Sequence, residues 1–305
     1  MPRIALKVDV DTLRGTREGV PPLVKLLADK DAGASFLFSL GPDHTGRAIA
    51  RVFRPGFLSK VSRTSVVEHY GLKTLMYGVL LPGPDIGRRE AAVLRSVRDQ
   101  GFEVGVHCWD HILWQDHLLR HDERWALREM RRATDRHAEI FGTPPRLHGA
   151  AGWQFNAAAA RAEAVLGITY ASDTRGTHPF VPVDDQGTVL GPAQYPTTLP
   201  TLDELIGIDG ITADNVHTHL LALTEGATQD HVYTLHAELE GMKLLPVFRR
   251  LIDGWRAQGH SLVDLGELRD SAPATTLPRH RLELGTVPGR SGLLAVQGAL
   301  QSAAA

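Results

Sequence analysis

The sequence predicts an α/β fold in a single domain, and three observations support this prediction. Short β-rich runs are separated by longer helical patterns along the 305 residues. Glycines stand between a helical pattern and the following strand, where a left-handed helix end is expected, at Gly33, Gly101, Gly167 and Gly259. No linker rich in Pro, Gly or Ser divides the sequence. The repeated strand and helix unit fits either a barrel or a doubly wound sheet.

The first half of the chain holds three strand patterns and three helical patterns. The opening IALKV is strand-like, ASFLFSL is rich in apolar and aromatic residues, and FEVGVH alternates. Between these runs, apolar residues recur at helical spacing. The expected order is strand 4–8, helix 19–30, strand 34–40, helix 86–100, strand 102–107 and helix 122–141.

The second half continues the same alternation up to a different C-terminal segment. The runs ITYAS, VYTLH and SLVDL are predicted as strands, separated by helical patterns. The expected order is helix 156–166, strand 168–172, helix 212–224, strand 232–236, helix 243–258 and strand 261–265. From residue 273 onward turn formers dominate, and the chain ends in QSAAA. We therefore expect a domain over residues 1–272 and an extension over residues 273–305 with a frayed, disordered end.

Composition excludes several classes of protein. A hydrophobic share of 43% can supply a sizeable core. With 33 Lys+Arg against 35 Asp+Glu, the net charge of −2 gives no overall reason to bind nucleic acid. Cys108 is the single cysteine, so neither an internal disulfide nor a cysteine-rich zinc site can form, and a reducing compartment fits.

The N-terminus and the hydropathy pattern predict a cytoplasmic protein that is soluble or peripheral. The opening MPRIALKVDVD enters a strand pattern at once and lacks the features of a secretory signal. No apolar run approaches the roughly 20 residues that a spanning helix needs.

Polar side chains gather where the predicted strands end. In α/β folds the functional side chains lie at these positions. The candidates are Asp9, Asp11, His107, His111, Trp153, Asp173, Arg175, His236, Glu238 and Glu240.

Two aspartates and two histidines of this set have the spacing of a metal site. Asp9 and Asp11 are two residues apart, so their side chains lie on the same face of a strand. His107 and His111 meet on one face if the chain turns helical after the strand. One carboxylate with two imidazoles is a typical catalytic zinc shell, which leaves the second aspartate as a base.

Each of these residues also has an ordinary structural interpretation. Histidines four apart can be surface neighbours, and Asp-x-Asp at a strand end can be a helix cap or a turn. His236 can be a hydrogen-bonded core residue, and Arg175 can be a salt-bridged surface residue. Their joint occurrence at successive strand ends favours a functional site.

Six segments in chain order resemble the polysaccharide deacetylase (NodB-like) superfamily: KVDVDTLRGTREGVP, FLFSLGPD, GVHCWDH, AAGW, SDTRG and VYTLHAELEG. The first and fifth of them resemble in particular the branch that deformylates 4-deoxy-4-formamido-L-arabinose-phosphoundecaprenol in lipid A modification, a pathway that confers resistance to cationic antimicrobial peptides such as polymyxin. The likeness covers about residues 4–290. It implies a distorted (β/α) barrel and a metal-dependent amide hydrolase.

The resemblance also implies roles for five residues. Asp9 matches the general base and His236 the general acid. The metal ligands of the superfamily match Asp11, His107 and His111. Imidazole and carboxylate ligands favour zinc, while cobalt, nickel, manganese and iron also suit them.

The chain departs from the superfamily at two motifs. Many relatives carry an arginine in the third motif that orients the base, but Arg146 is not in register here, so we assign that role to Arg175 with Asp173 nearby. Cys108 replaces the usual Ser or Thr and is interpreted as a packed residue.

Several further residues have two interpretations each. Glu238 and Glu240 could orient His236 or contact the sugar, and Trp153 could wall the sugar site or be buried in the core. Arg14 and Arg17 could bind the sugar-linked phosphate or pair with Glu18 and nearby carboxylates.

Residues 47–83 form a long insertion that is basic and apolar. They include six basic residues against one acidic residue, Glu68, a local charge of 6 − 1 = +5. Such a segment can lie in an anionic membrane interface, here the cytoplasmic face of the inner membrane, or its apolar face can pack on the barrel. A polyprenyl-phosphate substrate favours the membrane interpretation. The basic residues are Arg47, Arg51, Arg54, Lys60, Arg63 and Lys73.

Two competing functions remain open. An N-deacetylase of peptidoglycan or chitin-type amino sugars would share the motifs, but such enzymes usually need export. A carbohydrate-binding relative without a metal is disfavoured because all five motif residues are present.

Overall fold

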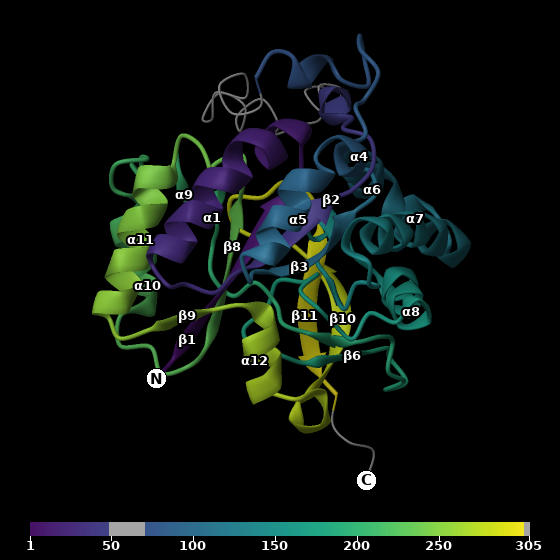
Figure 1. The fold of residues 1–305 in the computed structure, drawn as a ribbon. Coiled ribbons are helices and arrows are strands. Elements are labelled where there is room, and N and C mark those ends of the chain that lie inside the picture. Colours follow the sequence, from purple (N-terminus) through teal and green to yellow (C-terminus); the bar gives the residue numbers. More distant parts are fainter. Residues whose placement is uncertain (49–70, 302–305) are drawn as a thin grey trace.

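The computed structural model describes residues 1–48 and 71–301. The main sheet has eight parallel strands in the order β7-β5-β4-β3-β2-β1-β8, with β9 paired to the first residues of β1. This sheet curls into the predicted distorted (β/α) barrel (Figure 1). Its strands are β1 Arg3–Val10, β2 Ser35–Ser39, β3 Glu103–Cys108, β4 Leu147–His148, β5 Tyr170–Ala171, β7 Ala193–Gln194, β8 His231–His236 and β9 Ser261–Val263.

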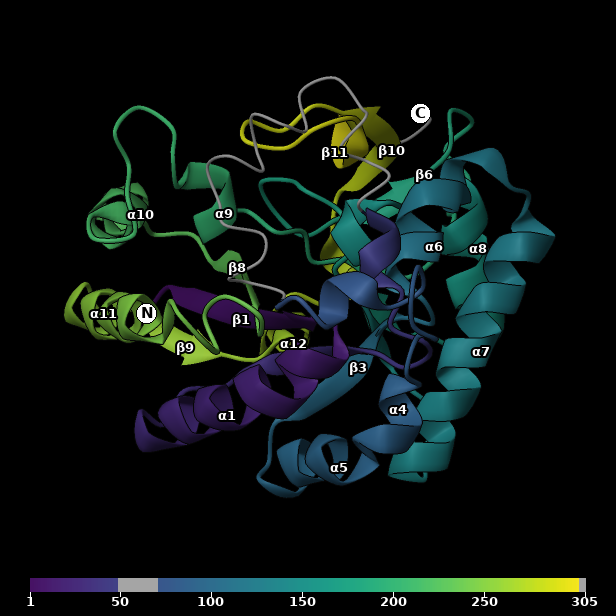
Figure 2. The same ribbon diagram turned by 90° about the horizontal axis from the view of Figure 1, so that it is seen from above.

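Helices cover the outer face of the sheet. Figure 2, seen from above, shows α1, α5, α7 and α8 in an arc outside the strands. The helices of the described residues are α1 Val20–Asp29, α4 Ile86–Arg89, α5 Ala91–Asp99, α6 His111–His117, α7 Glu123–Phe141, α8 Ala157–Leu166, α9 Leu202–Leu205, α10 Val216–Thr224, α11 Leu245–Ala257 and α12 Leu265–Ser271. None of the helices within residues 1–48 and 71–301 is long and apolar enough to cross a membrane.

Local sequence determines where these helices begin and end. The side chain of Asp122 accepts a hydrogen bond from the backbone N–H of Trp125 at the start of α7, and Asn156 does the same for α8. Gly167 ends α8 with a φ of 78°, and Gly101 and Gly259 have φ values of 90° and 87°, as predicted.

The prediction that Gly33 adopts a left-handed conformation at a helix end is wrong. The positive φ before β2 belongs to Asp31, at 46°. A Cβ atom on Gly33 would lie 2.8 Å from the backbone nitrogen of Asp264, so close backbone packing between the β2 and β9 regions requires glycine here.

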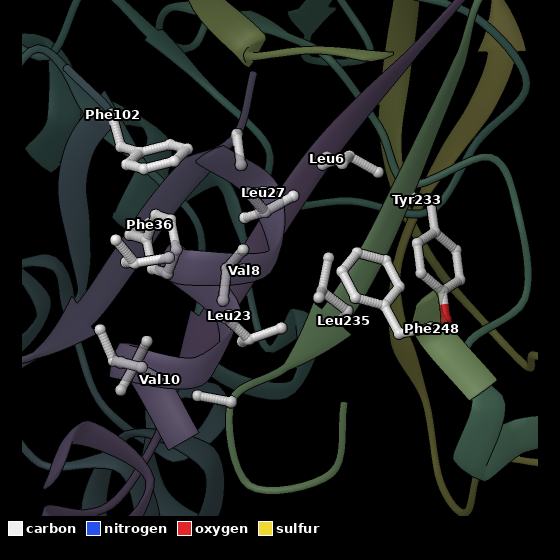
Figure 3. Close-up of a cluster of buried hydrophobic side chains, with 14 of the residues drawn as sticks. Leu6, Val8, Val10, Leu23, Leu27, Phe36, Phe102, Tyr233, Leu235 and Phe248 are labelled. Atoms are coloured by element: carbon white, nitrogen blue, oxygen red, sulfur yellow. The ribbon is translucent and has the colours of Figure 1, made fainter. Parts of the chain in front are cut away.

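The apolar faces of β1, β2 and β8 pack against α1 and α11 to form the largest core cluster. Figure 3 shows Val8 and Leu235 from neighbouring strands with Leu23 from α1 and Phe248 from α11. All four side chains are fully buried. This packing holds the ends of β1 and β8 in a fixed position, which matters because both strands carry candidate site residues.

A second sheet was not predicted from the sequence. It has three strands in the order β11-β10-β6, namely β6 Val181–Val183, β10 Arg279–Gly285 and β11 Leu294–Leu300. The strands β10 and β11 lie within the predicted extension, residues 273–305. Ala295 is fully buried and accepts a hydrogen bond from the backbone of Arg175, so the extension packs beside the loop after β5.

Candidate active site

The candidate site lies at the carboxyl ends of β1, β3 and β8. Asp9 is the register partner of His236 across the β1–β8 pair. His107 stands near the end of β3, and Asp11 follows β1. Because these strands are parallel, their ends meet at one edge of the barrel, as the sequence predicted.

Asp11, His107 and His111 form a compact triad. One carboxylate oxygen of Asp11, Oδ1, lies 3.2 Å from Nε2 of His107 and 3.4 Å from Nε2 of His111. The helix α6 begins at His111 because the side chain of Asp110 accepts a hydrogen bond from the backbone N–H of Leu113. The turn from strand to helix thus places the two imidazole rings 5.3 Å apart.

The triad fits a divalent metal ion. Ligand atoms about 2.0–2.1 Å from a tetrahedral ion lie roughly 3.3 Å from one another, which matches these separations. His107 donates a hydrogen bond from Nδ1 to the carbonyl oxygen of Gly149 over 2.6 Å, so Nε2, which faces Asp11, is the nitrogen that could bind a metal. Oδ1 of Asp11 is buried and has no hydrogen-bond partner among the described residues.

The charge state of Asp11 suits a metal ligand. Burial opposes its ionisation, but the neighbouring imidazoles of His111, His107 and His236 outweigh burial and hold the pKa of Asp11 below its usual range. The carboxylate is therefore ionised at neutral pH.

Glu238 holds the turn that carries Asp11. Its Oε1 accepts hydrogen bonds from the backbone N–H groups of Asp11 and Thr12 and from the Thr12 hydroxyl, at 3.1, 2.9 and 2.8 Å. Burial and the charge of Asp11 raise the pKa of Glu238 to about 8. A Cβ on Gly15 would overlap this carboxylate, so the glycine of the RGT segment makes room for it.

Glu240 binds the backbone of His236. It accepts a hydrogen bond from the backbone N–H of His236 over 2.9 Å and from the hydroxyl of Tyr233 over 3.1 Å. Burial raises the pKa of Glu240 to about 7. Glu240 thus holds the backbone at His236, and Glu238 holds the turn at Asp11; the roles considered for the two glutamates stay predictions.

Lys7 is the cation beside Asp9, and sequence reasoning missed it. Its Nζ lies 3.2 Å from Oδ2 of Asp9, and Lys7 and Asp9 are 0% and 3% exposed. The two residues lie two positions apart on β1 and so share a face of the strand. The i, i+2 spacing was the signal that could have identified Lys7.

Arg175 does not take the orienting role that we assigned to it. Its guanidinium donates to Oε1 of Glu204 over 2.5 Å and to the carbonyl oxygen of Leu199 over 3.1 Å. Asp173 accepts from His148 and from the backbone of Ala150. Arg175 is not beside Asp9 because the loop after β5 faces Glu204, and Lys7 on β1 is the cation that pairs with Asp9.

Trp153 is 1% exposed and packs among three cationic groups. Lys7, Arg175 and Arg290 lie 5.3, 5.0 and 4.7 Å from the centre of its ring system. Its indole N–H donates to the hydroxyl of Thr197 over 3.1 Å. This burial matches the interpretation in which Trp153 is a core residue.

Arg14 and Arg17 pair with carboxylates near the site. Arg14 donates to Glu18 over 2.9 Å, and Arg17 pairs with Glu90, which is 6% exposed. These contacts match the alternative in which the arginines hold the loop. Cys108 is 3% exposed and its Sγ lies 3.2 Å from Oγ of Ser39, so it is packed as expected.

Two relatives cover nearly the whole chain, while no family model matches the sequence. A protein of Shewanella sediminis (strain HAW-EB3) is 35% identical over 299 residues, which is 98% of this chain and 95% of the relative. A protein of Wigglesworthia glossinidia brevipalpis is 31% identical over 93% of this chain and 98% of its own length. Both are named probable 4-deoxy-4-formamido-L-arabinose-phosphoundecaprenol deformylase ArnD.

Solved structures share the fold at low sequence identity. A protein described as a polysaccharide deacetylase from Mycobacterium smegmatis superposes with a TM-score of 0.64 at 16% identity, covering 93% of this chain and 94% of that one. A probable polysaccharide deacetylase from Pseudomonas aeruginosa PAO1 gives 0.58 at 16% identity, covering 89% and 93%. These likenesses support the barrel fold.

Proposed function

This chain belongs to the 4-deoxy-4-formamido-L-arabinose-phosphoundecaprenol deformylase family of the NodB-like polysaccharide deacetylases, and from that premise we propose that it is a metal-dependent deformylase. Its substrate is the undecaprenyl-phosphate-linked 4-formamido sugar. The products are formate and the 4-amino sugar lipid, which serves lipid A modification and resistance to cationic peptides such as polymyxin.

One observation carries the proposal. The triad of Asp11, His107 and His111 lies at the same barrel edge as a buried carboxylate, Asp9, and an imidazole, His236. A hydrolase of amides needs a place for a Lewis acid, a base for water and an acid for the leaving nitrogen. The site supplies all three kinds of group.

Asp11, His107 and His111 would hold the metal, for which zinc is our first choice. When bound, the ion lowers the pKa of water and polarises the formyl oxygen.

Asp9 and His236 move the protons of the reaction. Oδ1 of Asp9 is buried without a hydrogen-bond partner among the described residues, so it is available to accept the proton of the attacking water. Water adds to the formyl carbon, and the C–N bond breaks as His236 donates a proton to the amine. Nδ1 of His236 is likewise buried without such a partner, so Glu240 orients His236 through the backbone only.

Purified protein is expected to release formate from the undecaprenyl-phosphate-linked 4-formamido sugar, and a chelator is expected to abolish this release. The matched control is the acetamido analogue, from which no acetate should appear. Formate and acetate can be quantified in the same reaction by enzymatic assay. Acetate release instead of formate would identify an N-deacetylase of amino sugars, and chelator-resistant formate release would contradict the metal.

The described part of the insertion supports contact with a membrane surface. Leu72, Val79 and Leu80 are 69%, 57% and 74% exposed, an unusual state for neighbouring large apolar side chains. Lys73 lies among them in the sequence. We therefore place the protein on the anionic cytoplasmic face of the inner membrane, where its lipid-linked substrate would be presented.

Reversing charge in the insertion is expected to weaken sedimentation with anionic liposomes. The variant is Arg51→Glu, Arg54→Glu and Lys60→Glu, three positions outside the described residues. Each basic residue near the surface contributes about 1 kcal/mol to binding, so the loss should be at least tenfold. The control reverses three basic residues on other elements, Lys25, Arg161 and Arg281. Equal sedimentation of both variants and the parent would remove the membrane proposal.

A further inference from the structure

A second cluster of ionisable groups lies away from the triad. It joins His148 at the end of β4, Asp173 after β5 and Glu163 on α8. Their exposures are 1%, 0% and 0%. Nδ1 of His148 lies 2.7 Å from Oδ1 of Asp173 and 2.8 Å from Oε1 of Glu163. Three ionisable side chains without access to water are costly to fold, so their arrangement requires an explanation.

The cluster is connected to the metal ligand His107 through three consecutive residues. His148 is followed by Gly149, whose carbonyl oxygen accepts the hydrogen bond from Nδ1 of His107 over 2.6 Å. Ala150 comes next, and its backbone N–H donates to Oδ1 of Asp173 over 2.8 Å. Asp173 thus binds the residues on both sides of the carbonyl group that orients His107.

Asp173 itself is held in place. Its Oδ2 accepts from the side-chain amide of Gln194 over 2.8 Å, and its backbone N–H donates to Oε1 of Gln194 over 3.0 Å. Gln194 lies on β7, the neighbour of β5 in the main sheet. A residue whose side chain and backbone are both hydrogen-bonded to a strand of the sheet can transmit a fixed position to the segment that it binds.

The distances favour a proton over a metal ion in this cluster. Nδ1 of His148 donates a hydrogen bond to Oδ1 of Asp173 over 2.7 Å, shorter than the 3.2 and 3.4 Å of the triad. Oε1 of Glu163 lies 2.8 Å from the same nitrogen, but neither carboxylate oxygen of Glu163 has a hydrogen-bond partner among the described residues. Against burial, Asp173 and Glu163 raise the pKa of His148 to about 10. Burial and the charge of Asp173 raise the pKa of Glu163 well above its usual value.

We propose that this cluster positions the metal ligand His107: Asp173 binds both His148 and Ala150 and so fixes the carbonyl group of Gly149 that lies between them. The inference rests on the proposed function, because it takes His107 as a metal ligand. The carbonyl oxygen of Gly149 accepts the hydrogen bond from Nδ1 of His107, and this bond leaves Nε2 as the nitrogen that binds the metal. In this proposal the cluster acts through His107 and does not itself contact the substrate.

Two variants with the same chemical change test the proposal. Asp173→Asn removes the charge that His148 needs, and metal affinity should fall about 10–100-fold, the usual effect of losing a partner of a metal ligand. Glu163→Gln keeps the shape of the side chain, and because neither oxygen of Glu163 has a hydrogen-bond partner among the described residues, metal affinity should stay within about threefold of the parent. Cobalt(II) binding in competition with a chromophoric chelator measures both, with circular dichroism as the control for folding.

The outcomes separate the failure of this inference from failure of the proposed function. A parent protein that binds no metal would overturn the proposed function. One bound ion with equal affinity in the parent and Asp173→Asn would overturn the positioning role alone. Two ions per chain, with one lost in Glu163→Gln, would show that the cluster is itself a metal site and would also overturn it.

A measurement on the metal-free parent protein needs no variant, should Asp173→Asn fail to fold. Nitrogen-15 NMR of the histidine side chains at pH 8 should show His148 as an imidazolium and a proton on Nδ1 of His107. A neutral His148, or a His107 without a proton on Nδ1, would overturn the proposal.

Discussion

Replacing Asp9 with asparagine is expected to lower kcat for formate release by about 10²–10⁴-fold, the contribution typical of a general base. The amide cannot accept the proton of the attacking water. Metal affinity should change little, because the proposed ligands are Asp11 and the two histidines of the triad. Steady-state kinetics with a parallel metal titration measures both quantities.

Asp11→Asn is the matched control for this prediction. It makes the same chemical change two residues away, but at a proposed ligand, so metal affinity and kcat should both fall. If Asp9→Asn loses metal as strongly as Asp11→Asn, then Asp9 is a ligand and the assignment of the base is wrong.

Replacing Lys7 with methionine is expected to destabilise the protein by about 3–5 kcal/mol, the cost of leaving a buried charge without its partner. The carboxylate of Asp9 is 3% exposed, and Nζ of Lys7 is the cation at 3.2 Å from it. Urea unfolding monitored by circular dichroism measures the change in the free energy of unfolding. Activity should fall as well, because Asp9 loses the group that orients it.

Two controls make the Lys7 prediction specific. Lys25→Met breaks a surface pair with Asp29, whose side chains are 77% and 51% exposed, and should cost no more than about 1 kcal/mol. The double variant Lys7→Met with Asp9→Asn removes both buried charges and should be more stable than Lys7→Met alone. The single variant Asp9→Asn completes the double-mutant cycle, and a double variant whose loss of stability equals the sum of the two single losses would mean that the pair carries no coupling.

Lys7 also shows why the base-orienting cation was misassigned from the sequence. A lysine in a strand is usually exposed, so the i, i+2 spacing with Asp9 was not followed, and the zero exposure of Lys7 shows that it is the partner of a buried carboxylate. Arg175 was assigned the orienting role because Arg146 is not in register with the arginine of the third motif. Its actual partner, Glu204, lies 29 residues further along the chain, and no local pattern connects the two.

Secondary structure could be predicted where the strand or helix pattern extends over at least five residues. The strands β1, β2, β3 and β8 lie within about two residues of their predicted bounds, and α7 begins one residue after its predicted start. The strand predicted over residues 168–172 contains β5, which is shorter, whereas β4 and β7 were not predicted because two residues are too few for an alternation to be visible. The hairpin of β10 and β11 was hidden by the turn formers around it, and its pairing with β6 joins residues about a hundred positions apart.

The sequence by itself determined the α/β class, the order of the long elements and the five motif residues at the strand ends, since these depend on local periodicity and spacing. The roles of these residues stay predictions that the Asp9 and Asp11 variants test. Only the tertiary structure decided which charges meet: Lys7 with Asp9, Glu238 with the Asp11 turn, and Asp173 with His148. Such pairs form because a buried charge must find a partner wherever the packed chain provides one, and that depends on the whole fold.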